Sequence, residues 1–125
     1  MIDIYLAAPY SHPDARKRDK RVLMVNRMAL KLMRMGITVF SPLTGSHELF
    51  LMSELDDDPT PLSGDFEYWE VYDRAILGVC QALVIYNLPG WYESRGVTSE
   101  IEIAKQMGKP VYESVEEYLE VRGNG

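Results

Sequence analysis

Residues 2–45 read IDIYLAAPYSHPDARKRDKRVLMVNRMALKLMRMGITVFSPLTG. Their first part, 2–8, is a short, mostly apolar run closed by a proline, which predicts a buried strand that ends in a turn. Residues 14–35 are helix formers with no internal Gly or Pro, and Gly36 is well placed to end that helix. A second β-branched run follows at 37–41. The segment therefore predicts a strand, a helix and a second strand in succession.

The rest of the chain continues this alternation of helix and strand. We first expect a short helix at 46–55 capped by Ser46, and then an acidic segment without periodicity at 54–65. A helix at 66–78 capped by Asp65, a strand at 82–87 and a loop at 88–96 should follow. The chain should then form a helix at 97–107 stopped by Gly108, a strand at 110–113, and a terminal helix that begins with a capping box of Ser114 and Glu117. Strands that read as apolar runs are typical of a parallel sheet covered on both faces. The sequence thus predicts one α/β domain over residues 1–125, a three-layer, flavodoxin-like (Rossmann-like) fold with a parallel sheet of four to five strands between helices.

Composition narrows the class of protein. Of the 125 residues, 46% are apolar and 26% are charged, which excludes a disordered or fibrous chain. Thirteen Lys and Arg against nineteen Asp and Glu give a net charge of −6, which disfavours a nucleic acid polymer as the partner. The one cysteine, Cys80, excludes a disulfide framework and suits a reducing compartment. No apolar run is long enough for a membrane span, so we expect a cytoplasmic protein that does not contact membranes.

The predicted helix at 14–35 carries two further signals. From residue 22 to residue 35, ten of fourteen residues are apolar, which is too many for one buried stripe. We therefore expect a second copy of the chain to cover the other face, in a homo-oligomer. The start of the same helix, residues 16–21, reads RKRDKR. This basic run either holds a phosphate at the strand ends or forms a solvated face, and the sequence leaves both interpretations open.

Ligands bind a parallel sheet beyond the carboxyl ends of its strands, which draws attention to the loops at 8–14, 41–46 and 88–100. No Gly-x-Gly-x-x-Gly or Walker A pattern is present, so we expect neither dinucleotide binding nor ATP hydrolysis by those devices. His12 and His47 lie in different loops, with no second ligand at a recognised spacing. A metal site is therefore not expected.

The third loop leads into a helix through Ser94-Arg95-Gly96-Val97-Thr98-Ser99-Glu100, and the free N–H groups at such a helix start suit an anion. Glu100 has two interpretations: with Glu102 it complements the helix dipole, or it works with a second carboxylate in catalysis. The candidate second carboxylate is Asp73, which stands among apolar residues inside a predicted helix, where Asp is unfavourable. The alternative for Asp73 is a surface ion pair, for example with Arg74.

These residues together carry a family resemblance. The order is Ile4-Tyr5-Leu6-Ala7-Ala8-Pro9, then Asp73, then Ala82-Leu83-Val84-Ile85-Tyr86, and then Ser94-x-Gly-Val-x-x-Glu100-Ile-x-x-Ala104. Over residues 2–9, 69–86 and 94–111 the chain resembles the nucleoside 2-deoxyribosyltransferase superfamily, which includes the 2'-deoxynucleoside 5'-phosphate N-hydrolases.

The resemblance implies a reaction and a site. Glu100 would be the nucleophile at the sugar C1', Asp73 the acid or orienting carboxylate, and Tyr5 the hydroxyl that positions the glutamate. The implied substrate-binding residues are Ala7, Ala8, Pro9, Ser94, Gly96 and Thr98, with Ser94 at a phosphate-contacting position. The expected reaction is cleavage or transfer of the N-glycosidic bond of a 2'-deoxynucleotide or deoxynucleoside, with no cofactor and no metal. The alternative is a non-catalytic nucleotide-binding or sensing module of the same fold.

Two residues depart from the superfamily's pattern. Glu102 stands where a Gly is usual, and it either raises the pKa of Glu100 through its like charge or points to solvent. Pro9 stands where the N-hydrolases carry a small hydroxyl residue that helps to hold the phosphate.

Overall fold

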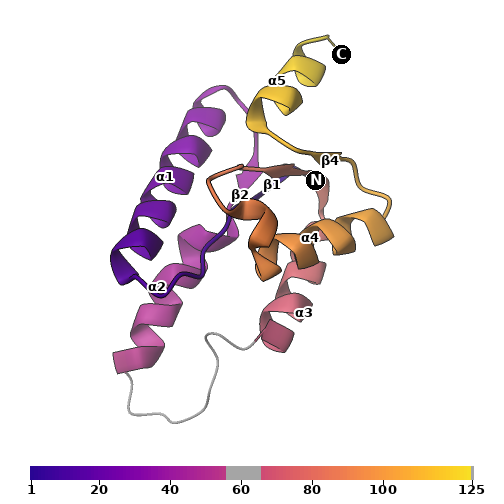
Figure 1. Ribbon diagram of the computed structural model, residues 1–125. Helices are drawn as coiled ribbons and strands as arrows, with labels where there is room; N and C mark the ends of the chain where they lie inside the picture. Colours follow the sequence, from indigo (N-terminus) through magenta and orange to yellow (C-terminus); the bar gives the residue numbers. More distant parts are fainter. Residues whose placement is uncertain (56–65, 125) are drawn as a thin grey trace.

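The computed structural model describes residues 1–55 and 66–124, and Figure 1 shows how they are arranged. The strands are β1 (Ile2–Ala7), β2 (Val39–Phe40), β3 (Cys80–Ile85) and β4 (Val111–Tyr112). The helices are α1 (Ala15–Arg34), α2 (Pro42–Leu55), α3 (Phe66–Leu77), α4 (Arg95–Gln106) and α5 (Val115–Asn124), with one short 3-10 helix, η1 (Trp91–Glu93).

All four strands run parallel in one sheet, in the order β2-β1-β3-β4. In the register of this sheet, Ile4 of β1 lies opposite Val39 on one side and Ala82 on the other. Helices α1 and α5 pack on one face, and α3 and α4 pack on the other, as Figure 1 shows. The predicted three-layer, flavodoxin-like α/β fold is confirmed.

Strand β1 shows why these strands read as apolar runs. Ile4 and Leu6 enter the core beneath α1 and α5, whereas Tyr5 and Ala7 enter the core beneath α3 and α4. All four side chains are fully buried. Successive side chains of a strand point to opposite faces, so a sheet covered on both faces leaves no position for a polar alternation. The same geometry directs the Tyr5 ring toward α3 and α4.

Two elements differ at their starts from the predicted boundaries. The helix predicted at 46–55 begins at Pro42, so Ser46 is an interior residue and not its cap. Proline suits the first helical turn, because the missing N–H would have no partner there. The helix predicted at 97–107 begins at Arg95, because the Ser94 hydroxyl caps it by accepting a hydrogen bond from the Val97 N–H at 3.2 Å.

The strands also differ in extent from the prediction. Of the strand predicted at 37–41, only residues 39–40 form β2, because the Ile37 N–H donates a hydrogen bond to the Leu32 carbonyl at the end of α1. Strand β3 starts at Cys80, two residues early, and β4 is confined to 111–112. Residues 56–65, which hold most of the predicted acidic segment and the predicted Asp65 cap, lie outside the described residues.

Helix α1 buries one stripe, formed by Val22, Val25, Ala29 and Leu32. Gly36, with φ +86°, ends it as predicted, because glycine adopts this left-handed conformation without a steric penalty. Four other apolar side chains of the predicted excess remain about half exposed: Leu23, Leu30, Met33 and Met35. The described part of the chain therefore does not cover them. Among the described helices, none is both long and apolar enough to cross a membrane.

Candidate active site

The strand order reverses between β1 and β3, and the loops that follow these two strands lie side by side. The Tyr86 N–H donates to the Ala7 carbonyl at 2.8 Å, which extends the contact between the strands past their ends. The Arg21 side chain of α1 then joins the two loops: it donates to the Ser11 carbonyl at 2.9 Å and, more distantly, to the Pro89 carbonyl at 3.5 Å. A reversal of strand order at the carboxyl edge is where ligands bind in open α/β sheets.

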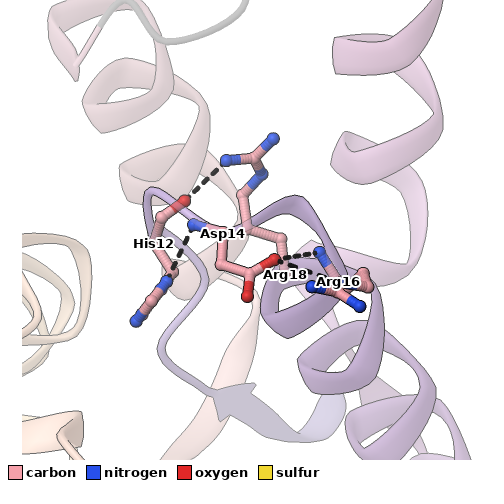
Figure 2. Close-up of polar contacts among 4 residues, drawn as sticks. All are labelled: His12, Asp14, Arg16 and Arg18. Atoms are coloured by element: carbon pink, nitrogen blue, oxygen red, sulfur yellow. Dashed lines mark hydrogen bonds and ion pairs between the residues drawn. The ribbon is translucent and has the colours of Figure 1, made fainter.

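The basic run at the start of α1 is partly used to hold this loop, as Figure 2 shows. The Asp14 carboxylate caps the helix by accepting from the Arg16 N–H at 2.9 Å, and the Asp14 N–H donates to His12 Nδ1 at 2.9 Å. Arg18 donates to the His12 carbonyl. The Arg16 side chain is 94% exposed. Arg18 and Arg21 therefore fix loop backbone, a structural role that neither sequence interpretation included.

The three predicted catalytic residues come together on the face of the sheet covered by α3 and α4. Tyr5 comes from β1, Asp73 from α3 and Glu100 from α4. Glu100 occupies the buried stripe of its helix at helical spacing from Val97 and Ile103, and only 6% of its surface is exposed. The Tyr5 side chain is fully buried. The helix-dipole interpretation of Glu100 requires a position in the first turn, but α4 begins at Arg95 and has no acidic residue in its first turn, so the structure favours the paired-carboxylate interpretation.

Desolvation raises the pKa of both carboxyl groups above their ordinary values. The pKa of Glu100 is raised to about 8, mainly by desolvation and then by the charge of Asp73, while the Tyr5 hydroxyl opposes the rise. The pKa of Asp73 is raised to about 6 by desolvation, again opposed by Tyr5. No described cation offsets either effect. A carboxyl pair of this kind is typical of sites that use one group as base or nucleophile and the other as acid.

The Tyr5 hydroxyl lies close to both acids but has no hydrogen-bond partner among the described residues. It makes no hydrogen bond of standard geometry to any described residue, although it is close enough to both carboxyls to lower the pKa of each. Burial, followed by the charges of Glu100 and Asp73, raises its own pKa well above the usual value. A buried unpaired hydroxyl costs free energy in the unliganded protein, and functional sites are among the places where such a cost is found.

The structure does not bring all of the predicted substrate-binding residues to one place. Ala7, Ala8 and Pro9 are buried at the end of β1, and Ser94 caps α4 at the same edge of the sheet. Thr98 instead lines a separate cavity of about 430 Å³ on the outer side of α3 and α4. None of the three clustered residues lines that cavity.

The structure also shows where the Glu102 side chain lies relative to Glu100. Its side chain is exposed and lines the outer cavity with Thr98. The charge that raises the pKa of Glu100 comes from Asp73, and Glu102 is not among the causes. Gly96 is also exposed. Glu102 therefore points to solvent, one of the two alternatives that the sequence left open.

A row of aromatic rings beside the carboxyl pair was missed by the sequence reasoning. The Tyr5 and Phe40 ring centroids are 5.6 Å apart, those of Phe40 and Tyr72 are 6.5 Å apart, and those of Tyr72 and Trp69 are 5.5 Å apart. The available signal was the dense aromatic run Tyr68-Trp69 followed by Tyr72, directly before Asp73. Such a row offers π faces next to the acids.

Both histidines are bound to other residues of the chain. The Tyr10 hydroxyl is hydrogen-bonded to His47 Nδ1 at 2.8 Å, and His47 Nε2 lies 3.3 Å from an Asp19 carboxylate oxygen. His12 binds the Asp14 backbone. In the part of the chain that the structure describes, no three His, Cys, Asp or Glu side chains converge on a common point.

Fold and cluster together define the class: a three-layer α/β protein with a buried and a half-buried carboxyl group and a phenol close to both. The chain belongs to the family described as Domain of unknown function (DUF1937), whose model matches residues 2–116. This span contains every described strand and all three clustered residues. No curated protein gives a significant match to the sequence.

Replacing the Tyr5 hydroxyl tests whether it governs the acids. In Tyr5→Phe the ring still packs on Phe40, but the contact that lowers both pKa values is lost, so we expect the pKa of Glu100 to rise above about 8 and that of Asp73 above about 6. Carboxyl ¹³C NMR titration measures both. Tyr72→Phe is the matched control, and unchanged carboxyl pKa values in Tyr5→Phe would contradict the assigned role.

Proposed function

We propose that this protein cleaves or transfers the N-glycosidic bond of a 2'-deoxynucleoside or its 5'-phosphate, with Glu100 as nucleophile. The observation that carries the proposal is the burial of Glu100 beside Asp73, with the unpaired Tyr5 hydroxyl against both. The resemblance of the sequence to the nucleoside 2-deoxyribosyltransferase superfamily supports the same roles for the same three residues.

The reaction follows from the chemistry of the two acids. The ionised Glu100 carboxylate attacks C1', the bond between C1' and the base nitrogen breaks, and the base leaves with the proton of Asp73. The ester between Glu100 and the sugar is then attacked at C1' by water or by the nitrogen of a second base. In that step Asp73 takes back a proton, and Glu100 is released as a carboxylate.

The surroundings of the pair fit such a substrate. The row formed by Phe40, Tyr72 and Trp69 supplies aromatic faces for a planar base, since bases stack on aromatic rings with favourable energies. A 2-deoxy sugar lacks the electron-withdrawing hydroxyl that would destabilise an oxocarbenium-like transition state. Ser94 and the start of α4 lie at the carboxyl edge of the sheet, where a 5'-phosphate finds free N–H groups.

One observation favours the alternative, a non-catalytic nucleotide-binding module of the same fold. With its pKa near 8, Glu100 is mostly protonated at neutral pH, and a protonated carboxyl donates a hydrogen bond instead of attacking carbon. In that case the pair would recognise a nucleotide without cleaving it.

The test is incubation of the purified protein with each deoxynucleoside and each 5'-monophosphate, with and without an acceptor base. Free base is followed by chromatography, for the native chain, for Glu100→Ala and for the exposed control Glu102→Ala. Release that is lost only in Glu100→Ala is the expected result. Absence of release from every substrate, with a ligand-induced rise in melting temperature, would instead identify the binding module.

A further inference from the structure

Charge is distributed very unevenly along this chain. Residues 15–34, which form α1, hold eight of the thirteen Lys and Arg but only one of the nineteen Asp and Glu. The helix therefore has a net charge of +7 within a chain whose net charge is −6. Arg27, Lys31 and Arg34 are exposed, and none of the three forms an ion pair with a described residue. A strong local excess of one sign sets up a field that attracts the opposite sign.

The opposite charge lies on the same layer of the molecule. Helix α5 lies on the same face of the sheet as α1 (Figure 1), and its Val115 and Tyr118 enter the core to which α1 contributes. Residues 113–124, which are α5 and the two residues before it, hold four Glu and one Arg, Arg122, for a net charge of −3. Glu116 and Glu120, one turn apart on α5, are both exposed. This layer therefore presents a basic helix and an acidic helix to solvent.

An apolar hollow lies at the α1 side of this layer. A cavity of about 220 Å³ is lined by Met24, Met28 and Tyr86 together with the stems of Arg27 and Lys31. Met28 and Tyr86 also pack against the core that the two helices share. A binding surface with an apolar centre and charged edges is the usual anatomy of a specific protein interface.

We propose that the layer formed by α1 and α5 is the surface on which a second copy of this chain docks, with α1 of each copy against α5 of the other. If the two-fold axis lies between the two helices and runs parallel to them, α1 of each copy faces α5 of the other copy. The perpendicular two-fold axis would place α1 on α1 and α5 on α5. Like charges in contact cost several kcal/mol at an interface, so the charge pattern selects the first arrangement.

The same pattern argues against a polyanion as the occupant. A nucleic acid duplex laid on this face would meet the α5 glutamates beside α1, and the chain as a whole is acidic. A second copy satisfies both charges of the face at once. It also covers the apolar hollow and the excess apolar side chains of α1.

A charge-exchange experiment tests the pairing without knowledge of individual contacts. Sedimentation equilibrium is expected to show a dimer of the 14.3 kDa native chain that dissociates at high salt. Arg27→Glu with Lys31→Glu lowers the net charge of α1 from +7 to +3 and places two acidic side chains at the apolar hollow, opposite the glutamates of α5 in the other copy. Glu116→Lys with Glu120→Lys changes the net charge of residues 113–124 from −3 to +1, so that it repels α1. Each double variant is expected to weaken dimerisation on the order of 100-fold. An equimolar mixture of the two is expected to regain the dimer, because each altered helix then meets its complement.

Controls separate this result from a loss of folding. All four substitutions are on exposed side chains, and Glu120→Lys alone replaces the α5 variant if thermal melting shows that the double variant is destabilised. Lys105→Glu, exposed on α4 on the opposite face, is expected to leave the dimer intact. A native chain that stays monomeric, variants that still dimerise, or a mixture of folded variants that stays monomeric would each overturn the proposal. Salt-sensitive binding of a DNA oligonucleotide by a monomeric native chain would point to a polyanion instead.

Discussion

Glu100→Gln is expected to abolish base release and, at the same time, to make the protein more stable at alkaline pH. The loss of activity should be at least about 1,000-fold in kcat, because the amide cannot form the covalent glycosyl ester. The gain in stability has a separate cause. Glu100 is buried and its pKa is raised to about 8 from an ordinary value of 4.5, so the folded state resists its ionisation.

The sign of the stability effect follows from proton binding. Between about pH 4.5 and about pH 8, the unfolded chain has lost the Glu100 proton and the folded chain has kept it. The folded state therefore binds more protons, and the free energy of unfolding of the native chain falls as pH rises through this window. Glutamine does not titrate, so the variant avoids this loss. By pH 8 the difference should be on the order of 4 kcal/mol, and it should vanish near pH 4.

Urea unfolding at a series of pH values measures the difference, and Glu102→Gln is the matched control. Glu102 is two residues away on the same helix but exposed, so its replacement should change the free energy of unfolding little at any pH. If Glu100→Gln were no more stable than the native chain at pH 8, the side chain would be ionised in the folded state, and the weak acidity assigned to it would be wrong.

This prediction describes a general conflict between function and stability. A buried carboxyl with a described acid beside it, and no described cation to offset either, is unfavourable for folding. Apolar replacement at position 100 would suit the core formed by Val97, Ile103 and Ala104. The presence of Glu at that position is therefore better explained by what the side chain does than by what it stabilises.

The sequence predicted the fold well because its main signals are periodic. Apolar runs at 2–8 and 82–87, separated by helical spacing and glycine stops, are sufficient to specify parallel strands covered on both faces. Boundaries were less accurate where side chains decide them. The Ser94 cap and the Pro42 start are local hydrogen-bond and proline effects that periodicity does not register.

The sequence could indicate which three residues lie close together, but not what surrounds them. The position of Glu100 on the buried stripe of α4 can be read from helical spacing, and that of Tyr5 from strand alternation. That Phe40 and Tyr72 lie next to each other depends on the packing of α3 against the sheet edge, which no local pattern contains. The placement of α1 and α5 on one layer is likewise a property of the strand order.

The second large effect expected is a bell-shaped dependence of kcat/KM on pH, with a maximum near pH 7. The acids interact, so they titrate as a pair, with pKa values of about 6 and about 8. Below the first value both groups are protonated and the nucleophile is absent. Above the second value both are ionised and the leaving base receives no proton. The competent form is the singly protonated pair with the proton on Asp73. Because the pKa of Glu100 is the higher of the two, this is the less populated of the two singly protonated forms, and the Tyr5 hydroxyl lies where it can stabilise the charge on Glu100.

Asp73→Asn should change this profile and lower the rate on the order of 100-fold to 10,000-fold. The variant cannot donate a proton, so the alkaline limb should disappear. The remaining acidic limb should then report the ionisation of Glu100 alone, whose pKa should lie below about 8 because the charge of Asp73 is absent. A deoxyriboside whose leaving group departs without protonation should lose far less activity in Asp73→Asn than in Glu100→Gln. Measurement of kcat/KM from about pH 5 to about pH 9 for both substrates checks each point, with Glu70→Gln on the same helix as control. Equal losses on both substrates would show that Asp73 orients Glu100 and does not supply the proton, because only an acid is made dispensable by a leaving group that needs none.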